Sequence, residues 1–162
     1  MCASNSSTIA AIALAACLAV PLARAAGPVE VQWLQSDTYS DAGRSVTERE
    51  QVMRELGEFM TKLGRLLPDG LSLKLEITDL DLAGDLEPMR WRDQRILRGR
   101  ADWPQMRLRY TLSADGRTLK SAEAQLSDMN YQSSILFGAR QEALVYEKHM
   151  IEEWFRTEFA AP

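Results

Sequence analysis

Four acidic side chains lie close together in the segment EITDLDLAGDLEP, residues 76–88. Carboxylate oxygens are the ligands that hard divalent cations prefer, and paired carboxylates also act as acid and base in hydrolysis. The segment therefore predicts a candidate metal site or, as a third possibility, a carboxylate-based hydrolase. The simpler alternative, which we favour, is a strand end followed by a turn from Asp81 to Gly84. The candidate metal ligands are Asp79, Asp81, Asp85 and Glu87.

The spacing of these acids excludes an EF-hand calcium loop. A loop that begins at Asp79 has the required glycine at Gly84. Its fifth and twelfth positions, however, are Ala83 and Arg90, where the template needs carboxylate or amide ligands. Only a looser arrangement of carboxylates remains as a metal site.

The segment after the acids is rich in arginine and tryptophan. Guanidinium groups bind carboxylates and phosphates in a fork geometry, and indole rings stack on flat or cationic groups. This segment predicts binding of an anionic envelope ligand, such as a lipid headgroup or a cell-wall carboxylate. The alternative, which we favour, is internal pairing of the arginines with Asp79, Asp81, Asp93 and Asp102. The candidate ligand-binding residues are Arg90, Trp91, Arg92, Arg95, Arg98, Arg100 and Trp103.

The chain lacks the residue types for the common catalytic centres. His149 is its only histidine, and its two cysteines, Cys2 and Cys17, lie near the N-terminus. A histidine-based triad or a zinc site of several histidines therefore cannot form within one chain. We assign no catalytic residue and no cofactor.

The first 25 residues have the pattern of a secretory signal peptide. Residues 9–23 are small and apolar, and Ala23-Arg24-Ala25 matches the A-x-A cleavage signature. This predicts a periplasmic protein with one domain over residues 26–162. The alternative is a lipoprotein anchored to the membrane through Cys17, because Leu14-Ala15-Ala16-Cys17 resembles a lipobox. The net charge of −4 argues against a nucleic-acid partner.

The hydrophobic periodicity predicts an α+β fold. Alternating apolar residues predict strands near 29–33, 71–77 and 106–112, with a hairpin turn at 114–116 leading into a last strand at the sheet edge. Apolar residues at helical spacing predict helices over about 45–67, which opens with a capping box at Ser45 and Glu48, and about 141–159. The predicted order is strand, helix, strand, strand, strand, helix, with a long connection over 84–104. We expect a mainly antiparallel four-stranded sheet with two helices on one face.

The apolar pattern of the second predicted strand changes phase at Thr78 and Asp79. Odd positions are apolar up to Ile77, whereas Leu80 and Leu82 are even. One extra residue in a strand moves every later side chain to the opposite face. We therefore expect a bulge or a strand end here, with Asp79 and Asp81 held by backbone donors or by arginines of the next segment.

Four stretches of the chain resemble a known family. They are DLDLAGDLEP (79–88), DWPQMRLRY (102–110), QLSDMNY (125–131) and YEKHMIEEWF (146–155). Together they resemble the domain-of-unknown-function family 3016, a group of small exported bacterial proteins, over about 29–159. The resemblance implies an exported single domain and carries over no activity and no catalytic residue. It also leads us to expect Asp79, Asp102 and Asp128 near one edge of the sheet.

These observations favour a non-enzymatic envelope protein with an interaction or maintenance role. Its partner would be another envelope protein or an anionic envelope ligand. The alternative is a binding protein for a divalent metal or an anionic ligand, which would use the acids of 79–87 and the arginines and tryptophans of 90–103.

Overall fold

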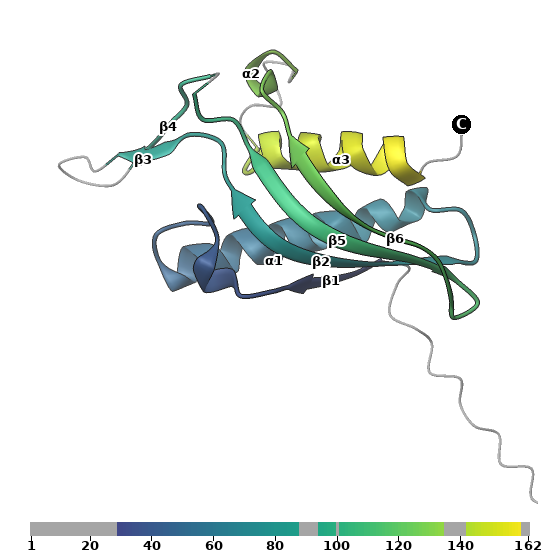
Figure 1. Cartoon of the computed structure of the whole chain (residues 1–162). Coiled ribbons are helices and arrows are strands. Elements are labelled where there is room, and N and C mark those ends of the chain that lie inside the picture. The colour runs from purple at the N-terminus through teal and green to yellow at the C-terminus, as the bar shows by residue number, and fades with distance from the viewer. Residues whose placement is uncertain (1–28, 88–93, 100, 135–141, 160–162) are drawn as a thin grey trace, which may run out of the picture.

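The computed structural model describes residues 29–87, 94–99, 101–134 and 142–159 (Figure 1). Four strands form one sheet in the order β1–β2–β5–β6. Their bounds are β1 Val29–Trp33, β2 Leu71–Asp81, β5 Gln105–Ala114 and β6 Arg117–Ser127. The α+β class is as expected. The predicted signal peptide, residues 1–25, lies outside the described residues.

The sheet is mixed, which corrects the expected mainly antiparallel arrangement. β2 pairs antiparallel with β5 and β5 pairs antiparallel with β6, but β1 runs parallel to β2. The reason lies in the connection between β1 and β2, which contains the long helix α1, Val46–Leu63. A helix carries the chain back to the end of the sheet where it started, so that the next strand runs in the same direction.

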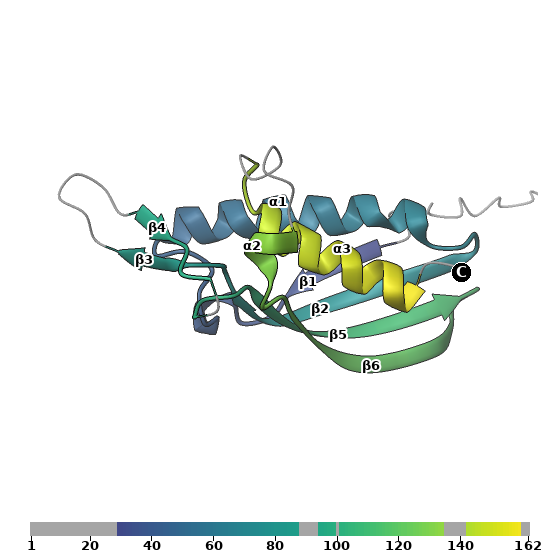
Figure 2. The same cartoon turned by 90° about the horizontal axis from the view of Figure 1, so that it is seen from above.

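Two helices cover one face of this sheet. Figure 2 shows α1 and α3, Val145–Phe159, side by side on the same side of the strands. The core between the layers holds fully buried side chains from both, among them Leu56, Leu75, Ile77, Leu108 and Phe155. This confirms the two helices on one face. The opposite face of the sheet is polar.

The start of α1 confirms the predicted capping box. The Ser45 hydroxyl accepts a hydrogen bond from the Glu48 backbone amide at 3.1 Å, and the Glu48 carboxylate accepts one from the Ser45 amide at 3.3 Å. These bonds satisfy backbone donors that a helix start leaves free. The helix ends at Leu63 and continues as the 3-10 turn η2, Gly64–Leu66, slightly before the predicted end.

The predicted bulge in β2 is confirmed. The pairing of β2 with β5 shifts register between Ile77 and Asp79. Beyond the shift, Leu80 and Leu82 are buried although they are even-numbered. The bulge therefore keeps the apolar side chains of β2 in the core on both of its sides.

The hairpin of β5 and β6 is also as expected. Asp115 and Gly116 both have positive φ, at 49° and 75°. Two such residues make the type I′ turn that suits the twist of two antiparallel strands. β6 forms the edge of the sheet.

The expected long connection after β2 contains a small second sheet. Strands β3, Asp85–Glu87, and β4, Gln94–Ile96, pair antiparallel and extend past the end of the main sheet (Figure 1). Gly84 makes this bend possible. It has a φ of +81°, and a Cβ added there would lie 2.7 Å from the Ile96 carbonyl oxygen.

Two short helical turns complete the fold. η1, Ser36–Thr38, follows β1, and α2, Tyr131–Ser134, follows β6. The last helix, expected from about 141, begins at Val145. Within the described residues, no helix is long and apolar enough to cross a membrane.

Candidate functional site

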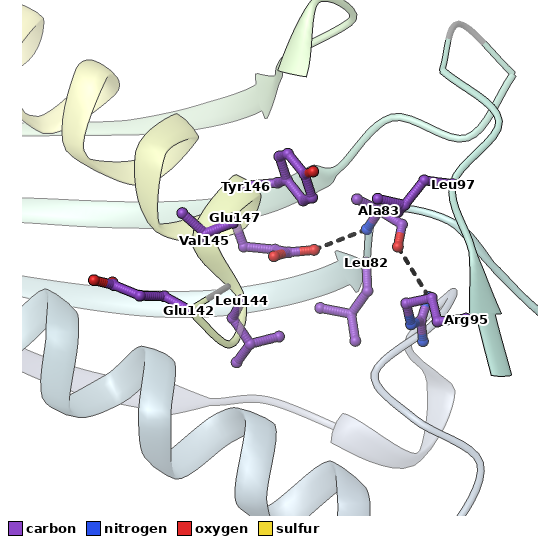
Figure 3. Close-up of a pocket in the computed structure, with 9 residues that line it drawn as sticks. All are labelled: Leu82, Ala83, Arg95, Leu97, Glu142, Leu144, Val145, Tyr146 and Glu147. Carbon is purple, nitrogen blue, oxygen red and sulfur yellow. Dashed lines mark hydrogen bonds between the residues drawn. The ribbon is translucent and has the colours of Figure 1, made fainter. Parts of the chain in front are cut away.

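Three segments that are distant in sequence enclose a cavity beyond the end of β2 (Figure 3). One is the chain leaving β2, the second is β4 with the residue after it, and the third is the start of α3. The cavity has a volume of about 200 Å³. Its lining is mostly apolar and contains four ionisable side chains, those of Arg95, Glu142, Tyr146 and Glu147. The lining residues are Leu82, Ala83, Arg95, Leu97, Glu142, Leu144, Val145, Tyr146 and Glu147.

Glu147 is the buried ionisable group of this cavity. Only 3% of the residue is exposed, although it lies in the first turn of α3. Its Oε1 accepts a hydrogen bond from the Ala83 backbone amide at 2.8 Å (Figure 3). Burial raises the pKa of the Glu147 carboxyl, while the Ala83 amide and the Arg95 charge act against that rise. The site therefore favours the neutral acid more than water does.

Arg95 lies on the other side of the Ala83 backbone. Its guanidinium pairs with the Asp41 carboxylate at 2.8 Å and donates to the carbonyl oxygens of Ala83, at 3.3 Å, and of Gly84. Figure 3 shows Ala83 between Glu147 and Arg95. Ala83 thus contacts the buried carboxyl through its amide N–H and the guanidinium through its carbonyl oxygen. That guanidinium already has three oxygen partners.

The backbone at the start of α3 is strained. Leu144, which lines the cavity, has a φ of +54°. A bulky residue rarely adopts this conformation, and such strain persists only where the surroundings impose it. Lys148 contributes to that constraint, since its ammonium group bonds to the Glu55 carboxylate at 2.6 Å and to the Ala143 carbonyl at 2.8 Å. The contact fixes the start of α3 against α1.

A second polar contact supports the site from the side of β6. The Tyr131 hydroxyl, on a residue with no exposed surface, donates to Asp102 Oδ1 at 2.7 Å. The Asp102 carbonyl accepts a hydrogen bond from the Gly84 amide at 2.9 Å. The ring of Tyr131 also packs edge-on against Tyr146, with 4.8 Å between centroids. Burial is the main cause that raises the pKa of Tyr131 to about 12.

The four stretches that carry the family resemblance meet here. The stretch 79–88 contacts 102–110 through Gly84 and Asp102, and it contacts 146–155 through Ala83 and Glu147. The stretch 102–110 contacts 125–131 through Asp102 and Tyr131. The junction at this end of the sheet is therefore built from all four.

Asp79, the first candidate metal ligand, holds the bulge of β2. Its Oδ1 accepts hydrogen bonds from the backbone amides of Ser40, at 2.8 Å, and Leu80, at 3.0 Å. Its Oδ2 accepts one from the Ser40 hydroxyl and lies 3.2 Å from the Arg107 guanidinium. The expectation that backbone donors order Asp79 is confirmed.

The other three acids do not share the partners of Asp79. Asp85 and Glu87 both pair with Arg98. Asp81 forms a backbone bridge with Asp41, and burial together with the Asp41 charge raises its pKa. In the described ranges, no three His, Cys, Asp or Glu side chains are grouped as a metal site. The structure does not bring the four acids together as one set of ligands.

The arginine and tryptophan segment is described only in part. Arg95 and Arg98 pair internally, but with Asp41, Asp85 and Glu87 in place of the acids expected. Trp103 is half-buried. The remaining members, Arg90, Trp91, Arg92 and Arg100, lie outside the described residues.

Asp79, Asp102 and Asp128 lie at the same end of the main sheet but have different partners. Asp128 Oδ1 accepts a hydrogen bond from the Asn130 amide at 2.9 Å. Its Oδ2 is buried and has no partner among the described residues. Asp79 instead accepts hydrogen bonds from backbone amides at the bulge, and Asp102 accepts one from Tyr131. Each of the three carboxylates therefore has its own partners.

Sequence reasoning missed Glu147, the buried carboxyl of the cavity, and Asp41, the partner of Arg95. A signal for Glu147 was present, because it lies three and four residues before Met150 and Ile151, both buried. Helical spacing therefore places this acid on the apolar face of α3. Asp41 had no comparable signal, since it lies in a polar segment between β1 and α1.

Comparisons with known proteins give a family but no activity. No curated protein and no solved structure matched the chain. A family model, described as a protein of unknown function, matches residues 27–157. This chain belongs to that family, DUF3016.

Proposed function

We propose that this chain is an exported, periplasmic, non-enzymatic binding protein whose cavity beside Glu147 holds a small ligand. Export rests on the sequence of residues 1–25, which has the pattern of a signal peptide. Processing at Cys17 as a lipoprotein is the alternative route to the same compartment. The partner is then a molecule or a protein surface of the cell envelope.

The observation that carries this proposal is the buried carboxyl in a largely apolar cavity. Small-molecule sites are mostly apolar hollows with a few polar groups that orient the ligand. Leu82, Leu97 and Leu144 provide the apolar walls, and Glu147 provides the polar group. A buried ionisable group with a shifted pKa is also a general mark of functional sites.

A purely structural role for Glu147 is the competing explanation. Its hydrogen bond to the Ala83 amide ties α3 to the end of β2. That bond alone needs no cavity, and it places no requirement on the strained backbone at Leu144. A test must therefore block the cavity and leave the hydrogen bond intact.

Saturation-transfer NMR with a mixture of small fragments provides this test. Leu97→Trp adds volume to the cavity wall at a residue that is 37% exposed. Leu119→Trp makes the same change on β6, where Leu119 is 59% exposed and away from the cavity. We expect bound fragments with the wild type and Leu119→Trp, and none with Leu97→Trp. Equal signals from all three proteins, or none from the wild type, would contradict the proposal.

Binding of an anionic envelope ligand by the 90–103 segment is the weaker proposal. The two described arginines of that segment, Arg95 and Arg98, are already paired with carboxylates. An anion would have to displace these internal partners to use them. The cavity beside Glu147 needs no such exchange.

A further inference from the structure

We propose that the ligand of the Glu147 cavity is a primary amine on a short hydrocarbon chain. This inference rests on the binding function proposed above and names the chemical class of its ligand. Three features of the described residues support it: the balance of charge around the cavity, the absence of an ion pair to Glu147 within those residues, and the apolar walls.

The charges that face Glu147 favour a cationic ligand. The charges that act on Glu147 come from Arg95 on β4 and from Asp41 in the segment before α1. Glu142, just before α3, also lines the cavity, but its carboxylate points away from Glu147 (Figure 3). The remaining titratable group of the lining is the phenol of Tyr146. The lining together with Asp41 therefore holds three carboxyl groups and one guanidinium, and an anion would meet a net negative charge once Glu147 is ionised.

The guanidinium of Arg95 is not open to an anionic ligand. It pairs with Asp41 at 2.8 Å and donates to two backbone carbonyl oxygens. A bound carboxylate or phosphate would have to break these contacts. Repulsion from Glu147 would add to that cost.

Glu147 itself lacks a cationic partner within the described residues. The neutral Ala83 amide donates a hydrogen bond to its carboxyl group. The backbone amide of Glu147 itself, also neutral, helps to lower the pKa. No ion pair joins it to a lysine, an arginine or the histidine of those ranges. A carboxylate that loses water needs an opposite charge or strong donors, and an ammonium group supplies both.

The walls and the volume of the cavity indicate the polarity and the size of the ligand beyond its amino group. Leu82, Leu97 and Leu144 present hydrocarbon, which favours an alkyl chain over a polar one. An apolar cavity of about 150 Å³ is known to hold benzene. A volume of about 200 Å³ therefore suits an amine with about six to eight non-hydrogen atoms.

Binding of such an amine is coupled to the proton of Glu147. Burial raises the pKa of this carboxyl, so that the empty site keeps its proton up to a higher pH than an exposed glutamate does. The ammonium group binds the ionised form. The affinity for the amine must therefore increase as the pH rises through the pKa of Glu147, and a neutral ligand has no such dependence.

Isothermal titration calorimetry with three matched probes tests the inference. The probes are n-pentylamine, 1-pentanol and pentanoate, which share a chain and differ in charge. The proteins are the wild type, Glu147→Gln, Leu97→Trp and, as a matched control on the same helix, Glu153→Gln. The side chain of Glu153 is 68% exposed and lies outside the cavity.

We expect n-pentylamine to bind the wild type and Glu153→Gln equally. Binding to Glu147→Gln should be about tenfold weaker, the loss typical of one charged hydrogen bond. Leu97→Trp should abolish binding with Glu147 still in place, which keeps the test valid if Glu147→Gln does not fold.

Two results would overturn the inference in different ways. If 1-pentanol binds the wild type as tightly as n-pentylamine, the amine class is wrong and the binding function stands. The same holds if Glu147→Gln binds the amine like the wild type. If neither these probes nor the fragment mixture binds the wild type, the binding function is wrong as well.

Discussion

The Glu147 carboxyl accepts a hydrogen bond from the Ala83 backbone amide at 2.8 Å, across 64 positions of sequence. This bond fixes the first turn of α3 against the end of β2, the point where the chain leaves the main sheet. It also holds a carboxyl at the wall of the cavity. The same contact therefore serves the fold and the proposed site.

Glu147→Gln should change how stability depends on pH. In the folded protein the pKa of this carboxyl lies above its ordinary value of 4.5. Between pH 4.5 and the raised pKa, the folded protein therefore binds more protons than the unfolded chain. The unfolding free energy of the wild type must then fall as the pH rises through that interval. The variant lacks this loss. Urea unfolding at about pH 4 and about pH 7 should show the variant gaining relative to the wild type at the higher pH.

Glu153→Gln is the matched control for this measurement. Its carboxylate is exposed on the same helix, and its substitution should shift stability little at either pH. An equal difference between Glu147→Gln and the wild type at both pH values would show that the pKa of Glu147 is not raised.

Removing the Asp79 carboxylate should destabilise the bulge of β2. Asp79→Ala leaves the backbone amides of Ser40 and Leu80 without their acceptor. An unsatisfied buried donor costs about 1–3 kcal/mol, and we expect a loss in this range because Leu80 is buried, whereas Ser40 is exposed and its amide can bind water. Asp79→Asn keeps an amide oxygen for these donors and loses the Arg107 ion pair and the acceptor of the exposed Ser40 hydroxyl, so its loss should be smaller. Chemical denaturation measures both, with Asp37→Ala on an exposed turn as the control. A loss in Asp79→Asn as large as in Asp79→Ala would contradict the role given to the backbone bonds.

Local patterns allowed several features of this fold to be predicted. The capping box of Ser45 and Glu48 depends on residues three apart, and the bulge at Asp79 depends on the alternation of its own strand. Each signal lies within the element that it describes. Such features can be read from a sequence because few distant contacts change them.

The pairing of β1 with β2 was not predicted, because it depends on how distant strands come together. The connecting helix α1 contained the needed information, since a helical crossover makes the two strands parallel. β3 and β4 have three residues each, too few for a periodicity to emerge. The bond between Glu147 and Ala83 joins segments with no pattern in common, and only the folded chain reveals the site.

Tyr131→Phe should remove one of three tyrosines whose pKa is raised, the others being Tyr39 and Tyr110. The pKa values of Tyr131 and Tyr39 are both raised to about 12, chiefly by burial. Above pH 10.0, the ordinary pKa of a tyrosine, the folded state keeps this phenol proton up to a higher pH than the unfolded chain does. The unfolding free energy therefore falls as the pH rises toward 12. Phenolate absorbance during alkaline titration should show three groups that ionise above the ordinary pKa in the wild type and two in the variant. Tyr39→Phe should give the same count, and an unchanged count in Tyr131→Phe would refute the assignment.

The ion pair of Arg95 and Asp41 should contribute more to stability than that of Arg98 and Asp85. The side chains of the first pair are 25% and 26% exposed, and those of the second are 45% and 60% exposed. Solvent and salt screen the more exposed pair more strongly. Double-mutant cycles with Arg95→Met and Asp41→Asn should give a coupling of about 1 kcal/mol, against about zero for Arg98→Met and Asp85→Asn. A coupling that is equal in the two cycles would contradict this ranking.

Export should leave a mature chain that begins at Ala26. The A-x-A signature of Ala23, Arg24 and Ala25 is the site at which signal peptidase would cut. The intact mass of the protein from the periplasm of a bacterial host should equal that of residues 26–162 without a lipid. Cys17→Ser should leave this mass and the processing unchanged, whereas Ala25→Leu should block cleavage. A lipid-modified chain that starts at Cys17, and is lost in Cys17→Ser, would identify the protein as a lipoprotein.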